Sequence, residues 1–184
     1  MEGGQAQPGS PVSAVARLLA AVEALIDGMG QITIWIVLVM IGLVATNVLL
    51  RYSASIGSVW AQELEWHLLA ALILLGMCYA LQRGDNVRVD LFYANYTPRT
   101  KFVVDLISSC LTLVVALIFV KLSLAYVAQS YSISESSPDP GGIPLRFIVK
   151  SLIPLGYSLL ALQALAELTR VVLSRQKQIQ APHV

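Results

Sequence analysis

Two carboxylates and an imidazole, from Glu63, Glu65 and His67, stand close together in the stretch "VWAQELEWHLLAALILLGMCYALQ", residues 59–82. Two neighbouring carboxylates could act as a general acid and a general base. On a helix, however, Glu63 and His67 share one face with Trp60. Glu65 then points about 160–200° away from that face. The spacing therefore excludes a catalytic pair made by the two glutamates.

The surrounding composition indicates an integral membrane protein. The chain has 184 residues, of which 57% are hydrophobic and 12% are charged, and its mean hydropathy is +0.72. A soluble domain carries about twice this share of charged residues. The formal net charge of +1 gives no excess of either sign that would suggest a nucleic-acid partner. Cys78 and Cys110 lie in apolar runs, and we expect both to be small buried hydrophobic residues.

Four segments are long enough to cross a hydrocarbon core of about 30 Å, which takes roughly 20 residues. We therefore predict an all-α fold, an integral membrane four-helix bundle. Thr97 and Pro98 are suited to the N-cap and first position of the third helix. Residues 1–12 are expected to be disordered, and the last residues form a tail. The predicted spans within the membrane domain (29–173) are 32–50, 60–81, 102–128 and 147–173, followed by the tail at 174–184.

Residues 13–28 carry an amphipathic pattern ahead of the first span. Apolar side chains recur there at helical spacing from Val15 to Ile26, while Arg17, Glu23 and Asp27 fall off this stripe. We predict an interfacial helix that lies on the membrane. The alternative is a helical extension of the first span.

The distribution of Lys and Arg predicts the orientation. Eight of these residues lie in the N-terminal arm, the second loop and the tail, and three lie on the opposite side. The positive-inside rule places the richer side in the cytoplasm. Both termini are therefore expected in the cytoplasm, and the loops after the first and third spans are expected to face outward.

With this topology the charged residues fall into two layers, each near one membrane boundary. We expect an inner layer of Arg83, Asp105, Glu167 and Arg170, and an outer layer that contains Glu63, Glu65, His67, Lys121 and Lys150. Three interpretations of the outer layer remain open. Its members could snorkel to water, pair within the bundle, for example Glu63 with Lys121 or Lys150, or contact a partner subunit.

The outer loop between the third and fourth spans has a distinctive composition. Its sequence "SISESSPDPGGIPLRF" (132–147) combines stiff prolines, a permissive Gly-Gly pair and acidic residues. We expect either an exposed docking loop for a soluble partner or a plain connector. The candidate docking residues are Glu135, Pro138, Asp139, Pro140, Gly141, Gly142, Pro144 and Arg146.

Several separated motifs resemble the small four-span membrane subunit, the DctQ-type small permease, of tripartite ATP-independent periplasmic (TRAP) transporters. The resemblance covers about residues 32–173. It rests on Trp60 with "QELEWHLL" (62–69), "VRVDLFY" (87–93) followed by Pro98-Arg99, and "SPDPGGIP" (137–144) followed by Arg146, Lys150 and "IPLG" (153–156).

This resemblance implies a non-enzymatic transport component of the bacterial inner membrane. In that family a periplasmic solute-binding protein (DctP-type) captures an organic acid, and a large permease (DctM-type) moves it inward, driven by an ion gradient. The small subunit acts as a membrane scaffold, with lipid as its other neighbour and no cofactor, metal or catalytic residue of its own. Candidate subunit or packing contacts are Trp60, Glu63, Glu65, His67, Lys121, Lys150, Asp105, Arg88 and Asp90.

Three other classes of protein fit the sequence less well. A haem-bearing or plain membrane anchor of a respiratory complex is the main alternative, but a haem usually needs two axial ligands, and His67 is the one histidine near a span. A proton-coupled exporter would need a carboxylate in the first span, and residues 32–50 contain no charge. A membrane enzyme would need a catalytic motif.

Overall fold

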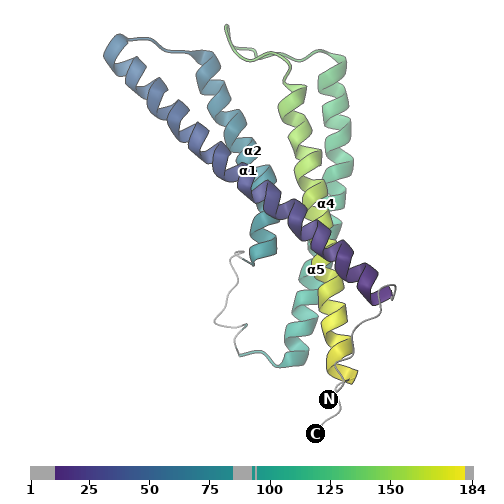
Figure 1. Cartoon of the computed structure of the whole chain (residues 1–184). Coiled ribbons are helices and arrows are strands. Elements are labelled where there is room, and N and C mark those ends of the chain that lie inside the picture. Colours follow the sequence, from purple (N-terminus) through teal and green to yellow (C-terminus); the bar gives the residue numbers. More distant parts are fainter. Residues whose placement is uncertain (1–10, 85–92, 94, 181–184) are drawn as a thin grey trace.

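The computed structural model describes residues 11–84, 93 and 95–180, and its elements are four long helices (Figure 1). They are α1 (Pro11–Ala54), α2 (Val59–Arg83), α4 (Pro98–Ser132) and α5 (Phe147–Gln180). All four are long and apolar enough to cross a membrane. The predicted all-α four-span bundle is confirmed. Arg88 and Asp90 lie outside the described residues, as do residues 1–10 and 181–184.

Local chemistry fixes the ends of two helices. The Ser58 side chain caps α2 by accepting a hydrogen bond from the Ala61 amide. Gly84, with φ of 70°, ends α2 in the left-handed conformation that favours glycine. The Thr97 hydroxyl accepts a hydrogen bond from the Thr100 amide at 3.3 Å and caps α4. Thr97-Pro98 therefore starts this helix as predicted.

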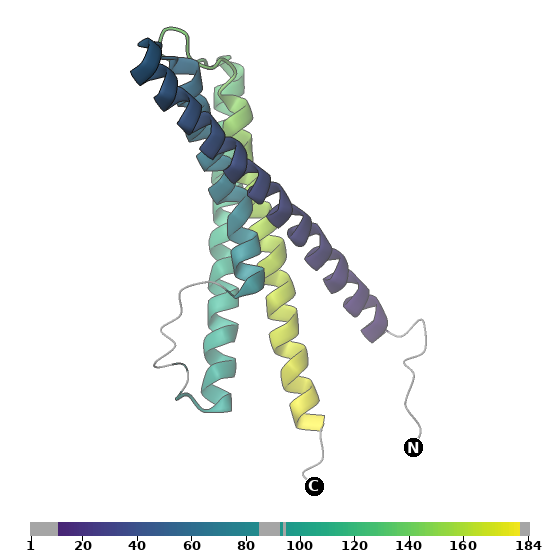
Figure 2. The same ribbon diagram turned by 60° about the vertical axis from the view of Figure 1, so that its left-hand side comes forward.

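Helix α1 is continuous where the sequence suggests two pieces. Its 44 residues span about 66 Å at 1.5 Å per residue, far more than a bilayer core. Figure 2 shows this helix crossing the others at an incline. No separate helix ends near residue 28, so the backbone follows the alternative of an extended first span. The position of residues 13–28 relative to the membrane surface stays a prediction.

Packing explains this continuity. Two residues of the amphipathic stripe, Val22 and Ile26, are buried in the protein core, while Leu18 remains exposed. At Gly30, a Cβ would lie 2.5 Å from the Tyr79 ring of α2. Gly30 thus allows close contact between α1 and α2. Part of the stripe therefore serves the bundle instead of the membrane surface.

The helices form two pairs, α1 with α2 and α4 with α5, and contacts between α2 and α5 join them. Figure 1 shows the pairs diverging toward the end that carries the outer loop. Helix α4 packs almost entirely against α5. Its buried face consists of small residues at a seven-residue spacing, which lets two membrane helices approach closely. These residues are Ser109, Ala116, Ser123 and Ser130.

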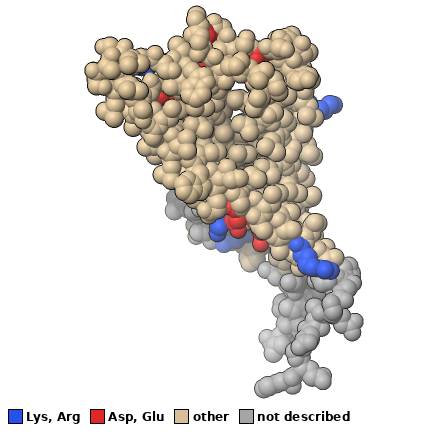
Figure 3. All heavy atoms as spheres, turned by 45° about the horizontal axis from the view of Figure 1, so that its top comes forward, with Lys and Arg blue, Asp and Glu red and all other residues tan. Residues whose placement is uncertain are grey.

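The core lies between α1, α2 and α5, and it includes Leu75, Cys78 and Leu159. Cys78 is buried as expected. The same expectation was wrong for Cys110, which is exposed on α4. In a membrane protein the lipid-facing side of a helix is apolar too, so an apolar run does not say which residues are buried. Figure 3 shows the result: uncharged residues cover most of the visible face.

Candidate functional site

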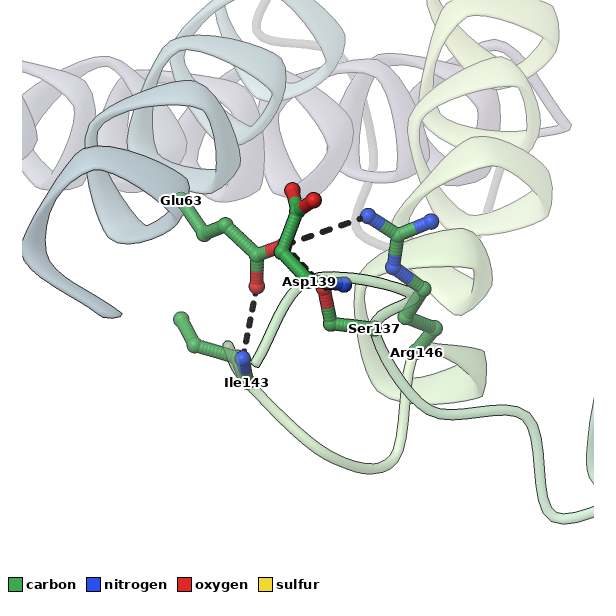
Figure 4. Close-up of polar contacts among 5 residues, drawn as sticks. All are labelled: Glu63, Ser137, Asp139, Ile143 and Arg146. Carbon is green, nitrogen blue, oxygen red and sulfur yellow. Dashed lines mark hydrogen bonds and ion pairs between the residues drawn. The ribbon is translucent and has the colours of Figure 1, made fainter. Parts of the chain in front are cut away.

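The clearest polar site joins the start of α2 to the outer loop, residues 133–146 (Figure 4). The Glu63 side chain is only 3% exposed. Its carboxylate accepts a short hydrogen bond from the Ser137 hydroxyl and one of 2.6 Å from the Ile143 amide. The Arg146 guanidinium lies 3.5 Å from the same carboxylate. We call these four residues the loop clamp, because one carboxylate holds both arms of the loop.

The sequence of the loop produces a tight turn at its tip. The Gly142 amide donates to the Asp139 carbonyl at 3.0 Å, and Gly141 has φ of 82°. Proline at the second position and glycine with positive φ at the third fit a type II turn. A Cβ at Gly142 would lie 2.7 Å from a Glu63 carboxylate oxygen and closer still to Ser137. The two glycines therefore have separate roles. Gly141 adopts the positive φ that the turn requires, and Gly142 leaves room for the Ser137 and Glu63 side chains.

Backbone hydrogen bonds connect the two arms behind this turn. The Ser137 amide donates to the Ile143 carbonyl at 3.3 Å, and the Arg146 amide donates to the Glu135 carbonyl at 2.9 Å. The loop is therefore a closed hairpin-like unit held at its tip by Glu63. The turn at its tip depends on Pro140 at the second position and on Gly141 at the third.

A second attachment ties the loop to the ends of α4 and α5. The Lys150 ammonium pairs with the Glu135 carboxylate and lies 4.1 Å from the centroid of the Tyr126 ring. Lys150 holds the pKa of Glu135 below its usual value, because the ammonium stabilises the ionised carboxylate. Glu135 thus engages a cation of its own chain, which removes it from the exposed rim that we expected it to form.

Within the described residues, Glu65 joins α2 to α1 and makes no hydrogen bond to the outer loop, which agrees with its position on the opposite face of α2 from Glu63. Its carboxylate accepts a hydrogen bond of 3.0 Å from the Asn47 side chain of α1. Asn47 is buried, and sequence reasoning did not single it out. The available signal was its type, since it is the one side-chain amide in the apolar run 32–50.

An open pocket of about 290 Å³ lies beside the loop clamp. Val59, Gln62, Glu63 and Trp66 of α2 line it, together with Asp139 and Pro140 of the loop. Trp66 is 60% exposed, and Trp60, six residues earlier on the same helix, is exposed as well. Exposed indoles beside a fixed turn are suited to protein contacts or to a membrane–water boundary.

The family model described as "Tripartite ATP-independent periplasmic transporters, DctQ component" matches residues 40–174. This chain belongs to the DctQ family. The resemblance suggested by the separated motifs is therefore confirmed, and the membrane-anchor alternative finds no support. No protein with a curated description matches the chain. The match covers α2, α4, most of α5 and the outer loop, but it leaves out the first part of α1.

DctQ proteins are components of transporters and not an enzyme family. Within the described residues of this DctQ-family chain, no group of three His, Cys, Asp or Glu side chains could hold a metal ion. The loop clamp pairs a carboxylate with donors at every side, which suits it to hold structure. It offers no free base or nucleophile.

At the other end of this DctQ-family bundle, the inner charges bind the N-terminal part of α1. The Arg83 guanidinium pairs with the Asp27 carboxylate at 2.9 Å, and Arg170 pairs with Glu23. Asp105 accepts a hydrogen bond of 2.8 Å from the Tyr93 hydroxyl. Sequence reasoning placed Arg83, Arg170 and Asp105 in one layer, but it did not identify Asp27 and Glu23 as the partners of the two arginines.

The outer layer is only partly brought together. Glu63 pairs with Arg146 and not with Lys121 or Lys150, a pairing that the sequence had left as one of several possibilities. Lys150 finds Glu135 instead. Lys121 is exposed on α4, away from these groups. The layer therefore separates into charges that the chain itself satisfies and one that it does not.

Proposed function

We propose that this chain is the small scaffold subunit of a TRAP-type secondary transporter that takes up organic acids. It would work with a large permease and a periplasmic solute-binding protein, and an ion gradient would drive uptake. Membership of the DctQ family is the observation that carries this proposal. The charges of the described chain support it, because most of them pair within the bundle, which suits a scaffold.

The proposed location is the bacterial inner membrane, with both termini in the cytoplasm. The bias of Lys and Arg supports this orientation. The outer loop would then face the periplasm, where the binding protein delivers its solute. A reporter fusion after Pro140 is expected to give a periplasmic signal, and one after Asn95 a cytoplasmic signal.

We further propose that the turn of the outer loop is part of the docking surface for the binding protein. Two attachments, at Glu63 and at Lys150, hold the loop in one conformation. A loop that is already ordered loses less entropy when a partner docks. Asp139 and Pro140 lie exposed at the turn and line the pocket beside Trp66. Asp139 therefore takes over the role of rim charge that the sequence divided between Asp139 and Glu135.

Co-expression with a DctM-type large permease tests the main proposal. A tag on the chain should recover the permease, and uptake into proteoliposomes should require both membrane proteins and the binding protein. Failure to recover the permease would contradict the scaffold role. A dithionite-reduced spectrum with haem bands would instead support the membrane-anchor alternative.

A further inference from the structure

Lys121 is the unusual charged residue of this bundle. It lies within α4, on an exposed part of the helix whose neighbouring side chains are apolar. Exposed apolar residues surround it, among them Leu117, Ile118 and Leu124. In the part of the chain that the structure describes, no hydrogen bond or ion pair involves Lys121, whereas the charges at the ends of α2 and α5 have partners.

The direction of Lys121 follows from the helix repeat. Helix α4 buries Ala116 and Ser123 against α5. At 100° per residue, Lys121 lies about 140° away from Ala116 around the helix. It shares its side with Ile107, Val114 and Ala128, all of which are exposed. These four residues define what we call the Lys121 face, and Figure 1 shows that α4 lies at the edge of the bundle.

Lys121 lies far from both ends of α4. It precedes Ser132, the last residue of α4, by eleven positions, which is about 16 Å along the axis. Side chains on a helix lean toward its N-terminus, so Lys121 leans away from this nearer end. Reaching lipid headgroups there would require the side chain to turn back along the helix. An ammonium among hydrocarbon chains is costly, and such residues mark contacts with another charge.

We propose that the Lys121 face packs against a membrane helix of the large permease, and that a carboxylate on that helix pairs with the Lys121 ammonium. This inference rests on the proposed function. Charge complementarity selects the occupant: a second copy of this chain on a two-fold axis would bring two ammonium groups together. The small side chains of Ala125 and Ala128 allow a partner helix to approach closely beside the lysine.

Charge variants of Lys121 test the pairing by the yield of permease recovered per folded small subunit. Lys121→Leu should lower the apparent affinity about three- to twenty-fold, the range for polar contacts in membranes. Lys121→Glu should lower it further, and Lys121→Arg should retain it. Leu122→Ala, a truncation at the neighbouring exposed residue, is the matched control and should change nothing. Size-exclusion profiles of the isolated variants should match that of the wild type, since Lys121 makes no hydrogen bond or ion pair within the described chain.

Photo-crosslinking tests the face directly. A photoreactive residue at Val114 or Ala128 should give adducts with the permease, while one at Val115 or Leu122 should give far fewer. Unchanged permease yield with Lys121→Leu would overturn the inference and leave the lysine as a snorkelling residue. Adducts from Val114 to lipid alone, or to a second copy of the chain, would overturn it as well. If the wild-type chain recovers no permease, the proposed function itself fails, which is a distinguishable result.

Discussion

The loop clamp and the Lys121 face handle charge in opposite ways. Glu63 is buried and accepts from three donors of its own chain. Lys121 is exposed and has no partner in the described residues. A buried charge is tolerated when it is paired and hydrogen-bonded, so the clamp is complete without any other protein. If the proposed pairing holds, the paired charges of the clamp fold this chain, whereas Lys121 assembles it with another.

The largest effect should come from breaking the clamp. Glu63→Ala removes the acceptor for the Ile143 amide and the Arg146 guanidinium, which leaves these partly buried donors without that partner. We expect protease cleavage within residues 133–146 to become about tenfold faster, because each lost acceptor favours local opening. Limited proteolysis with mass spectrometry measures this rate. Gln62→Ala, an exposed neighbour, is the control, and equal rates for both variants would contradict the clamp.

A smaller effect is expected at the tip of the same loop, where the chain would meet its soluble partner. Asp139→Lys leaves the backbone hydrogen bonds of the turn in place. We expect the binding-protein concentration for half-maximal uptake to rise about three- to tenfold at low salt, because rim charges act on association. High salt should reduce the difference. Uptake into proteoliposomes measures it, and an unchanged half-saturation would make the loop a connector only.

The hydrogen bond between Asn47 and Glu65 should contribute less than the clamp. It is one side-chain hydrogen bond among the many contacts between α1 and α2. Hydrogen bonds between membrane helices are worth about 0.6 kcal/mol on average. A double-mutant cycle of Asn47→Ala and Glu65→Ala, followed by unfolding in detergent, gives the coupling energy. Strictly additive effects would mean that the two side chains do not stabilise each other.

The smallest effect concerns pH. Lys150 lowers the pKa of Glu135 below its ordinary value of 4.5. A lowered pKa contributes stability above the ordinary value, and this contribution is lost as the pH falls toward the lowered pKa. Protease resistance of the loop should therefore decline below about pH 4.5, and Glu135→Gln should remove that part of the decline. Identical pH profiles for the wild type and the variant would show that this ion pair does not hold the loop.

The sequence predicted the helices well because their signals are local. Apolar length marks a membrane span, and Thr97-Pro98 marks the start of α4. It also placed Glu63 and Glu65 on different sides of α2, since that follows from the helix repeat. Gly141 and Gly142 were recognised as a permissive pair between stiff prolines, and the structure gives each glycine a distinct physical role.

The partners of these residues could not be predicted, because they are distant in sequence. Glu63 meets Ser137 and Ile143, which are 74 and 80 positions away. An apolar run also does not reveal which side faces protein and which faces lipid, so Cys110 was misjudged while Cys78 was not. The contact of Gly30 with the Tyr79 ring of α2 likewise joins residues that are distant in sequence.

The most direct test of the contrast is the thermal unfolding midpoint of the purified chain without partners, measured for Glu63→Gln and for Lys121→Leu. We expect Glu63→Gln to lower the midpoint by several degrees, because the clamp is internal to the chain. Lys121→Leu should leave the midpoint unchanged or raise it, because that residue makes no hydrogen bond or ion pair within the described residues. An equal fall in both variants would show that Lys121 belongs to the fold, and it would contradict the division between folding charges and assembly charges.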